Sequence, residues 1–143
     1  LLYKMHNLTE HFTLEEFLKS PTATAKKIDN TPTSSIIYAL HYGVSKILEP
    51  ARIKLGDKIV ITSGYRSKAL NTAIGGVYNS QHMKGEAADI HLPSKEYADR
   101  LFNILKSNKN VDQLLYEHSK RTTWIHVSWS IKPRQMFRYN YQA

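Results

Sequence analysis

The 143-residue sequence contains no cysteine, and no apolar run approaches the roughly 18 residues that span a bilayer. The first absence excludes a disulfide framework, a thiolate zinc finger and a cysteine nucleophile. A transition-metal site must therefore use carboxylates and some of the seven histidines. The second absence predicts no membrane span. No secretory signal is visible, and the first residue is Leu1, so we expect a fragment or a processed form.

Acidic residues are few, with 12 Asp and Glu against 20 Lys and Arg, and the formal net charge is +8. Such a balance predicts an anionic partner or environment. Nucleic acid, membrane surfaces and bacterial wall polymers are all anionic, so charge alone does not choose among them. The apolar fraction of 41% excludes a disordered chain. The length predicts one domain over residues 1–143.

The N-terminal part predicts helices. Thr13 and Glu16 form a capping-box pattern, so we expect a short helix that ends before Pro21, followed by an irregular stretch over 22–33. A longer helix with one apolar face is expected from Ser34 or Ser35 to about residue 54. Proline lacks an N–H group, so a break or kink is expected where this helix reaches Pro50.

The C-terminal part predicts one helix, over 94–106, and four strands. The strands are expected over 58–62, 87–92, 111–117 and 124–129. The polar stretch 63–81 predicts a long loop, and long loops in small domains are usually functional. Residues 132–143 are expected to form a basic, aromatic tail. The order predicts an α+β domain whose small sheet is largely antiparallel, with helices on one face and a cleft on the other.

Strand alternation predicts a polar site. If Ala88 and Ile90 face the core, Asp89 faces away from it, and the same reasoning places His126 and Glu117 on that second face. We therefore expect Asp89, Glu117 and His126 to reach one cleft. A turn at Gly85 would bring His82 over Asp89.

Two imidazoles and one carboxylate from His82, Asp89 and His126 would hold one zinc ion with a fourth position open, which is typical of catalytic sites. Zinc lowers the pKa of bound water, and Glu117 is placed to exchange its proton. Taken alone, these residues also fit an alternative, in which they are ordinary polar residues without a metal.

Four further residues are expected at the cleft. The fork-shaped guanidinium of Arg66 suits a substrate carboxylate or carbonyl, although a solvent-facing arginine is the alternative. We expect Ser80 and Gln81 to offer hydrogen bonds near the metal. Trp124 shares the His126 face and would wall the cleft, or lie buried in the core.

Several motifs, in order, resemble the zinc D-alanyl-D-alanine carboxypeptidase family. They cover residues 8–130 and include Glu10-His11-Phe12, Ser63-Gly64-Tyr65-Arg66-Ser67, Gly75-Gly76, Ser80-Gln81-His82 and Trp124-Ile125-His126-Val127-Ser128. The family includes wall carboxypeptidases, phage endolysins and dipeptidases of vancomycin resistance, and the Hedgehog signalling domain shares its fold and zinc site. The resemblance implies zinc ligands at His82, Asp89 and His126, and a substrate-binding role for Arg66.

One position departs from the family pattern. Many members carry the catalytic carboxylate a few residues before the last histidine, but no acid stands at 122–125 here. Glu117 is the nearest acid and follows a tyrosine, as in the Hedgehog domain. His118 is an alternative proton shuttle, although strand alternation places it on the opposite face.

The leading hypothesis is therefore a zinc metallopeptidase that hydrolyses peptidoglycan stem peptides, as a carboxypeptidase or an endolysin-like endopeptidase. Two alternatives stay open: a non-catalytic zinc module of the Hedgehog type that binds the wall or serves a structural role, and a nucleic-acid-binding domain. We expect a monomer with no specific nucleic-acid partner. It would act at the anionic cell wall or in the periplasm, or be delivered by a phage. The sequence does not separate these origins.

Overall fold

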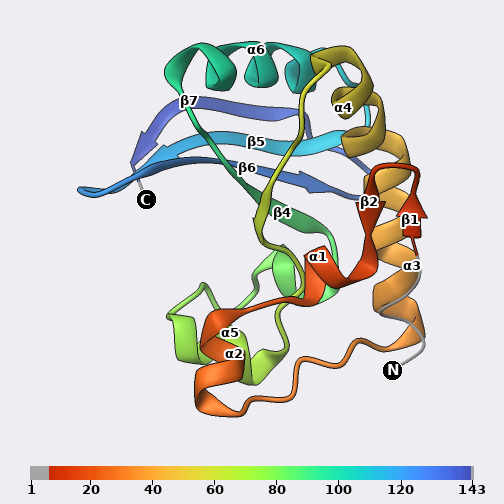
Figure 1. Cartoon of the computed structure of the whole chain (residues 1–143), viewed down its shortest axis with the longest axis vertical. Helices are drawn as coiled ribbons and strands as arrows, with labels where there is room; N and C mark the ends of the chain where they lie inside the picture. Colours follow the sequence, from red (N-terminus) through yellow and green to blue (C-terminus); the bar gives the residue numbers. More distant parts are fainter. Residues whose placement is uncertain (1–6, 143) are drawn as a thin grey trace.

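The computed structural model describes residues 7–142, without side-chain detail for 141–142 (Figure 1). Its elements are β1 (Asn7–Thr9), β2 (Phe12–Thr13), α1 (Leu14–Leu18), α2 (Pro21–Lys26), α3 (Ser34–Gly43), η2 (Val44–Leu48), α4 (Glu49–Leu55), β3 (Ile61–Ser63), α5 (Lys68–Ile74), η3 (Gln81–Lys84), β4 (Ala87–His91), α6 (Lys95–Lys106), β5 (Val111–His118), β6 (Thr123–Trp129) and β7 (Met136–Gln142). Among these described residues, no helix has the length and apolar character needed to cross a membrane.

The main sheet has the strand order β3-β4-β6-β5-β7, and β1 and β2 form a separate small hairpin. Three pairings of the main sheet are antiparallel, and β5 pairs with β7 in parallel. The predicted α+β class with a largely antiparallel sheet is confirmed.

Residues 136–142 form the edge strand β7, whereas the sequence predicted a tail there. Aromatic packing explains the difference. The Tyr139 ring lies 4.9 Å from that of Tyr116 and 5.4 Å from that of Phe102, measured between centroids. The Tyr139 hydroxyl also donates to Asp99 at 2.8 Å. These contacts hold the segment against β5 and α6.

The long helix runs without a break from α3 through η2 into α4, although Pro50 was expected to break or kink it. The segment η2 is a π-helical turn, in which the N–H of Glu49 donates to the carbonyl of Val44. This wider turn lies directly before the proline, which has no N–H to donate. The expected break is therefore absent, and a π-bulge lies just before the proline where the sequence predicted a break or kink.

Two other helices lie where irregular chain was expected. Thr13 caps α1 with the predicted capping box, but Pro21 then begins α2 instead of only ending α1, and the Ser20 side chain caps α2. Proline suits the first turn because that N–H has no helical partner. The expected loop 63–81 contains α5, which the Ser67 side chain caps.

The core lies between the sheet and the helices α3, η2, α4 and α6, which cover one face of it (Figure 1). Ala88 and Ile90 of β4 are fully buried there, as predicted. Trp129 packs so closely on Gly43 that a Cβ atom at Gly43 would lie 1.9 Å from the indole. The opposite face of β4 and β6 is left for polar side chains.

Candidate metal centre

The sheet register aligns the central residues of the site. Asp89 of β4 lies opposite His126 of β6, and His126 lies opposite Leu115 of β5. Glu117 pairs with Trp124 two residues further along. Because alternate residues share a face, Asp89, His126 and Glu117 all point away from the core, as the alternation predicted. All three line one pocket.

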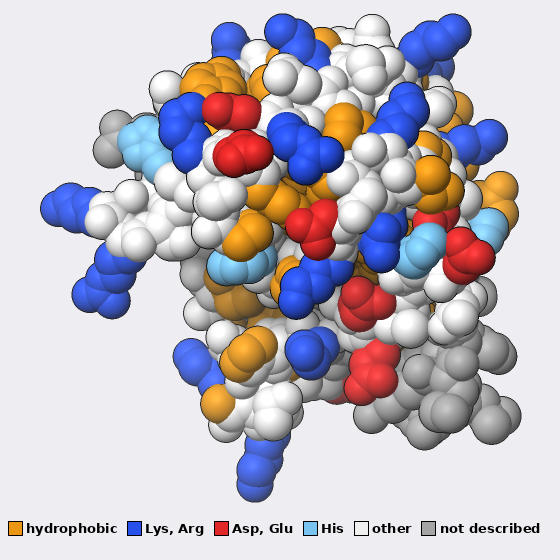
Figure 2. Space-filling model, turned by 45° about the horizontal axis from the view of Figure 1, so that its top comes forward, with side chains coloured by type: hydrophobic (Ala, Val, Ile, Leu, Met, Phe, Trp, Pro, Cys, Tyr) orange, Lys and Arg blue, Asp and Glu red, His pale blue; other side chains and the backbone are white. Residues whose placement is uncertain are grey.

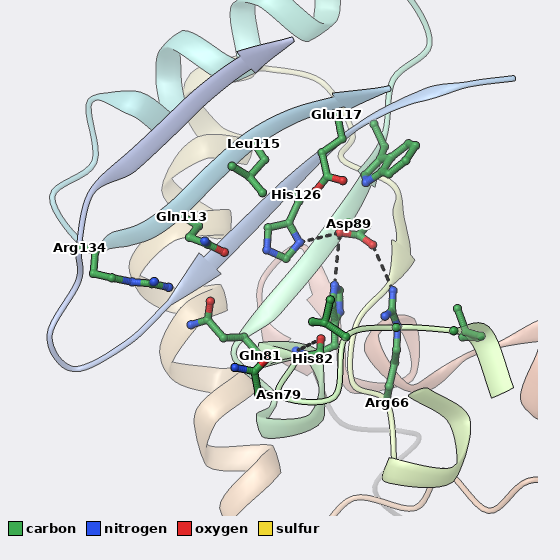
Figure 3. A pocket seen from close by; sticks show the side chains of 16 residues that line it. Arg66, Asn79, Gln81, His82, Asp89, Gln113, Leu115, Glu117, His126 and Arg134 are labelled. Carbon is green, nitrogen blue, oxygen red and sulfur yellow. Dashed lines mark hydrogen bonds and ion pairs between the residues drawn. The ribbon is translucent and has the colours of Figure 1, made fainter. Parts of the chain in front are cut away.

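His82 joins this face from η3, as Figure 3 shows. Asp89 Oδ1 lies 2.9 Å from His126 Nδ1 and 3.3 Å from His82 Nε2. One nitrogen or oxygen from each of the three side chains falls within 4.8 Å of the others. The sequence-predicted set of two imidazoles and one carboxylate is therefore gathered at one point.

The His82 ring is held by its second nitrogen. Its Nδ1 lies 2.7 Å from the carbonyl oxygen of Gly64, so this nitrogen carries the proton and donates. The other ring nitrogen, Nε2, faces Asp89 Oδ1. Gly85 closes the η3 turn with a φ of +70°, which suits glycine. A histidine that donates to a backbone carbonyl and turns its other nitrogen inward is the usual arrangement of a metal ligand, so the donor set fits zinc.

Asp89 is ionised in this setting. Burial tends to raise the pKa of its carboxyl, but His82 and His126 outweigh burial and hold that pKa well below its ordinary value. Its second oxygen, Oδ2, lies 3.4 Å from Arg66 Nη2. The carboxylate thus has one oxygen toward the histidines and one toward a cation.

Arg66 is largely occupied by protein partners. Its Nε donates to Ser63 Oγ at 3.0 Å, and its Nη1 donates to Asn71 Oδ1 at 3.3 Å. Its Nη2 points at Asp89, and the side chain is only 13% exposed. Burial lowers the pKa of Arg66, while Asp89 and Glu117 act in the opposite direction. Arg66 therefore lines the pocket as a fixed charge beside Asp89.

Glu117 faces the same pocket from β5 (Figure 3). Burial raises the pKa of its carboxyl, which the charge of nearby His126 partly offsets. A carboxyl whose pKa is raised toward neutrality suits proton exchange better than an ordinary surface carboxyl does. His118, the alternative, is the next residue along β5 and does not line the pocket.

Ser80, Gln81 and Trp124 line the pocket too. The Ser80 hydroxyl caps the backbone N–H of His82 at 3.2 Å, which ties it to the η3 turn. Gln81 Nε2 donates to Asp112 Oδ2 at 3.1 Å and to the Trp129 carbonyl at 3.2 Å. Trp124 is half-buried at the pocket, not in the core.

Sequence reasoning gave no site role to several residues that line the pocket, namely Ile74, Gly75, Gly76, Val77, Asn79, Gln113, Leu115 and Arg134, although the first five lie in the loop that it expected to be functional. Arg134 stands in the stretch expected to be a free tail. Its only signal in the sequence is a basic residue after the last predicted strand, and that signal does not identify its partner.

A second group of residues with metal-ligand chemistry lies elsewhere, at Glu10, His11 and Glu49. His11 Nδ1 lies 2.6 Å from Glu49 Oε2 and 3.5 Å from Glu10. Glu49 Oε1 also accepts from the Thr9 hydroxyl at 2.5 Å and from the His11 backbone N–H at 2.9 Å. These bonds tie the β1–β2 hairpin to the start of α4.

Comparisons with known proteins agree with the resemblance in the motifs. Over 51 residues the chain is 41% identical to a protein named zinc D-Ala-D-Ala carboxypeptidase from Streptomyces albus G. That match covers 35% of this chain, and it spans only about a fifth of the length of the relative. The family model of peptidase M15 matches residues 10–128, which include the three candidate ligands as well as Arg66 and Glu117. The chain therefore belongs to the peptidase M15 family.

Proposed function

We propose that this chain is a zinc metallopeptidase that hydrolyses peptide bonds in the stem peptides of peptidoglycan. The observation that carries the proposal is the convergence of His82, Asp89 and His126, with His82 fixed through Gly64, beside Glu117 in one pocket. Membership of a peptidase family and the similarity to a zinc D-Ala-D-Ala carboxypeptidase support the same assignment.

In this proposal His82, Asp89 and His126 hold one zinc ion. When bound, zinc supplies Lewis-acid polarisation of the scissile carbonyl and lowers the pKa of a coordinated water. Glu117 is the general base that takes a proton from the attacking water and passes it to the leaving amine. Arg66 helps to orient Asp89 through the contact of its Nη2 with Asp89 Oδ2 at 3.4 Å, and its charge would also favour a substrate carbonyl or carboxylate.

The proposal names a substrate class and the bonds within it that are candidates for cleavage. Peptidoglycan stem peptides are the class, and both the terminal D-Ala-D-Ala bond and an internal bond are candidates within it. The site of action would be the bacterial cell wall, reached as a host enzyme or by phage delivery. The +8 net charge suits the anionic polymers of that environment.

Two alternatives predict different behaviour. A non-catalytic zinc module would bind wall material without cleaving it, yet Glu117 with its raised pKa is present in the pocket. A nucleic-acid-binding domain would need a basic stripe or patch. Figure 2 shows Lys and Arg side chains scattered among acidic and apolar ones over the visible face.

The test compares zinc-loaded wild-type protein with Glu117→Gln, which keeps the size of the side chain but removes its basicity. Muropeptides are digested and analysed by mass spectrometry, and zinc content is measured in the same samples. We expect full zinc content in the variant and a rate about 10²–10⁴-fold lower, the usual contribution of a general base. The exposed Glu96→Gln on α6 is the matched control and should cleave normally.

Release of free D-Ala from wild-type digests would identify a carboxypeptidase, and cut stem peptides or cross-links would identify an endopeptidase. Native activity in Glu117→Gln would overturn the role of Glu117. A zinc-loaded wild type that cleaves no muropeptide would favour the non-catalytic module.

A further inference from the structure

Arg134 lines the same pocket from the segment that joins β6 to β7, and it extends toward Gln81 in Figure 3. It lies on the β5 side of the metal ligands, next to Gln113, whereas Arg66 lies on the β3 side. The pocket therefore carries one arginine on each side of the candidate ligands.

A buried carboxylate anchors this arginine. The Asp112 side chain is 2% exposed, and it accepts from Arg134 Nε at 3.0 Å and from Nη2 at 2.7 Å. The backbone N–H of Arg134 also donates to Asp112 Oδ1 at 2.7 Å. Gln81, which neighbours the ligand His82, donates to the other oxygen of the same carboxylate. These contacts fix the guanidinium relative to the metal centre.

The anchored guanidinium still has donors to spare. Its Nη1 makes no hydrogen bond within residues 7–142, and the side chain is 56% exposed. Each of the three guanidinium nitrogens of Arg66, by contrast, has a protein acceptor, and that side chain is 13% exposed. Arg134 is thus the more exposed of the two pocket arginines, and the described residues leave its whole Nη1 group free for a ligand.

We propose that Arg134 forms a carboxylate-binding subsite that selects the substrate and sets its position along the cleft. A planar guanidinium held on one edge by Asp112 keeps its outer N–H groups aimed at a second acceptor. A carboxylate is the expected ligand, because hydrogen bonds between two charged groups are stronger than those between neutral groups. Asp112 already orders the Arg134 side chain, so less conformational entropy is lost when the ligand binds. The inference rests on the proposed function for the identity of the substrate as a peptide.

A stem peptide offers such a group in two places, at its C-terminus and on an internal side chain. A C-terminal carboxylate at Arg134 would place the scissile bond near the chain end. An internal carboxylate would let the peptide continue past this point. The shared chemistry is the carboxylate, and the two sources require different substrates to tell them apart.

The test compares wild type with Arg134→Lys, whose single ammonium can pair with Asp112 but leaves no fork for the cleft. Three synthetic stem peptides are used: one with free carboxylates, one with a C-terminal amide and one with its side-chain carboxylates amidated. We expect Arg134→Lys to raise KM about tenfold on the free peptide with kcat nearly unchanged. One of the two amidated peptides should give the same KM with both proteins. The carboxylate that is amidated in that peptide is the one that binds Arg134.

The matched control is Arg138→Lys, an exposed arginine on β7 that does not line the pocket. It should leave KM unchanged. Because removing the partner of a buried carboxylate can unfold a protein, a second variant pairs Asp112→Asn with Arg134→Gln. It removes both charges together, and we expect the same rise in KM from it.

Calorimetric titration of the free peptide and the two amides into metal-free protein separates this inference from the proposed function. Weaker binding of one amide to wild type but not to Arg134→Lys supports the subsite even if no peptide is cleaved. Equal affinities of the three peptides in wild type, or an equal KM in wild type and Arg134→Lys on every substrate, would overturn it. If the peptides are cleaved but show no difference in affinity or KM, the proposed function holds and the role of Arg134 is wrong.

Discussion

Within residues 7–142, two clusters contain histidine and carboxylate groups at metal-binding distances, and they differ in how their donor atoms are occupied. At His82, Asp89 and His126, the second nitrogen of His82 is fixed by a backbone carbonyl and the ligand atoms turn inward to one point. At Glu10, His11 and Glu49, the carboxylate of Glu49 instead accepts three hydrogen bonds that join separate elements. The two clusters contain the same kinds of side chain, but the hydrogen-bond partners of these side chains differ.

The comparison shows that the residue type of a candidate ligand is a weaker sign of metal binding than the hydrogen bond that its remote atom makes. A histidine whose remote nitrogen is held by a carbonyl presents the other nitrogen in a fixed direction. His11, whose Nδ1 donates to the neighbouring Glu49, instead links two elements of the fold. We therefore expect zinc at the first cluster and a stability role for the second.

The largest expected effect breaks the first cluster. Asp89→Ala should abolish zinc binding and with it hydrolysis, since the two remaining imidazoles do not complete a three-ligand site. Glu49→Gln, the matched change in the second cluster, should retain one zinc per chain. Atomic absorption on both purified variants gives the answer, and loss of zinc from Glu49→Gln would reverse the assignment of the two clusters.

Removal of the metal should have the next largest effect. A ligand that binds only the folded state stabilises it by about 2.7 kcal/mol at a free concentration 100 times Kd. A chelator should therefore lower the melting temperature of wild type and of Glu49→Gln by the same amount, and leave Asp89→Ala unchanged. Differential scanning fluorimetry with and without chelator measures the three shifts. A smaller shift in Glu49→Gln would show that the second cluster also holds metal.

The second cluster should give a smaller effect on stability alone. Glu49→Gln removes one of two acceptor oxygens from a side chain that is 13% exposed, which typically costs about 1–2 kcal/mol. Urea unfolding of the metal-free proteins measures this cost. Glu10→Gln, at a side chain that is 80% exposed, should stay within about 0.5 kcal/mol of wild type.

The smallest expected effect is a dependence on pH. Burial tends to raise the pKa of Glu49, but hydrogen bonds from Thr9 and His11 outweigh it and the pKa lies below its ordinary value. A depressed pKa means that the carboxylate stabilises the fold above the unfolded-state pKa and loses this contribution as pH falls through the folded-state value. The stability gap between wild type and Glu49→Gln, measured by urea unfolding, should therefore narrow from about pH 6 to pH 3. A gap that widened over this range would contradict the sign.

Much of the fold and of the candidate metal site follows from local sequence patterns. Alternation in β4 and β6 is sufficient to place Asp89 and His126 on one face, and the apolar spacing of residues 94–106 predicts α6. The capping box at Thr13 is likewise complete within four residues. Each of these patterns depends on neighbours along the chain.

The features that were missed depend on distant partners. Residues 136–142 become a strand because Tyr139 meets Phe102 and Tyr116, and no local pattern encodes that contact. Arg134 belongs to the pocket because Asp112 of β5 anchors it. The helix also continues through Pro50, where local chemistry favours a stop, and Val44, Ile47 and Leu48 of the π-helical turn before it are buried in the core.

The pairing of Asp89 with His126 across β4 and β6 also bears on how the chain folds. A slip of one residue between these strands would turn every side chain of one strand to the other face, so that Val127 would replace His126 beside Asp89. The proposed set of three ligands comes together only when the strands meet in the native register. Uptake of metal during refolding would therefore report correct strand alignment, and a metal held there would favour the aligned sheet over its slipped competitors.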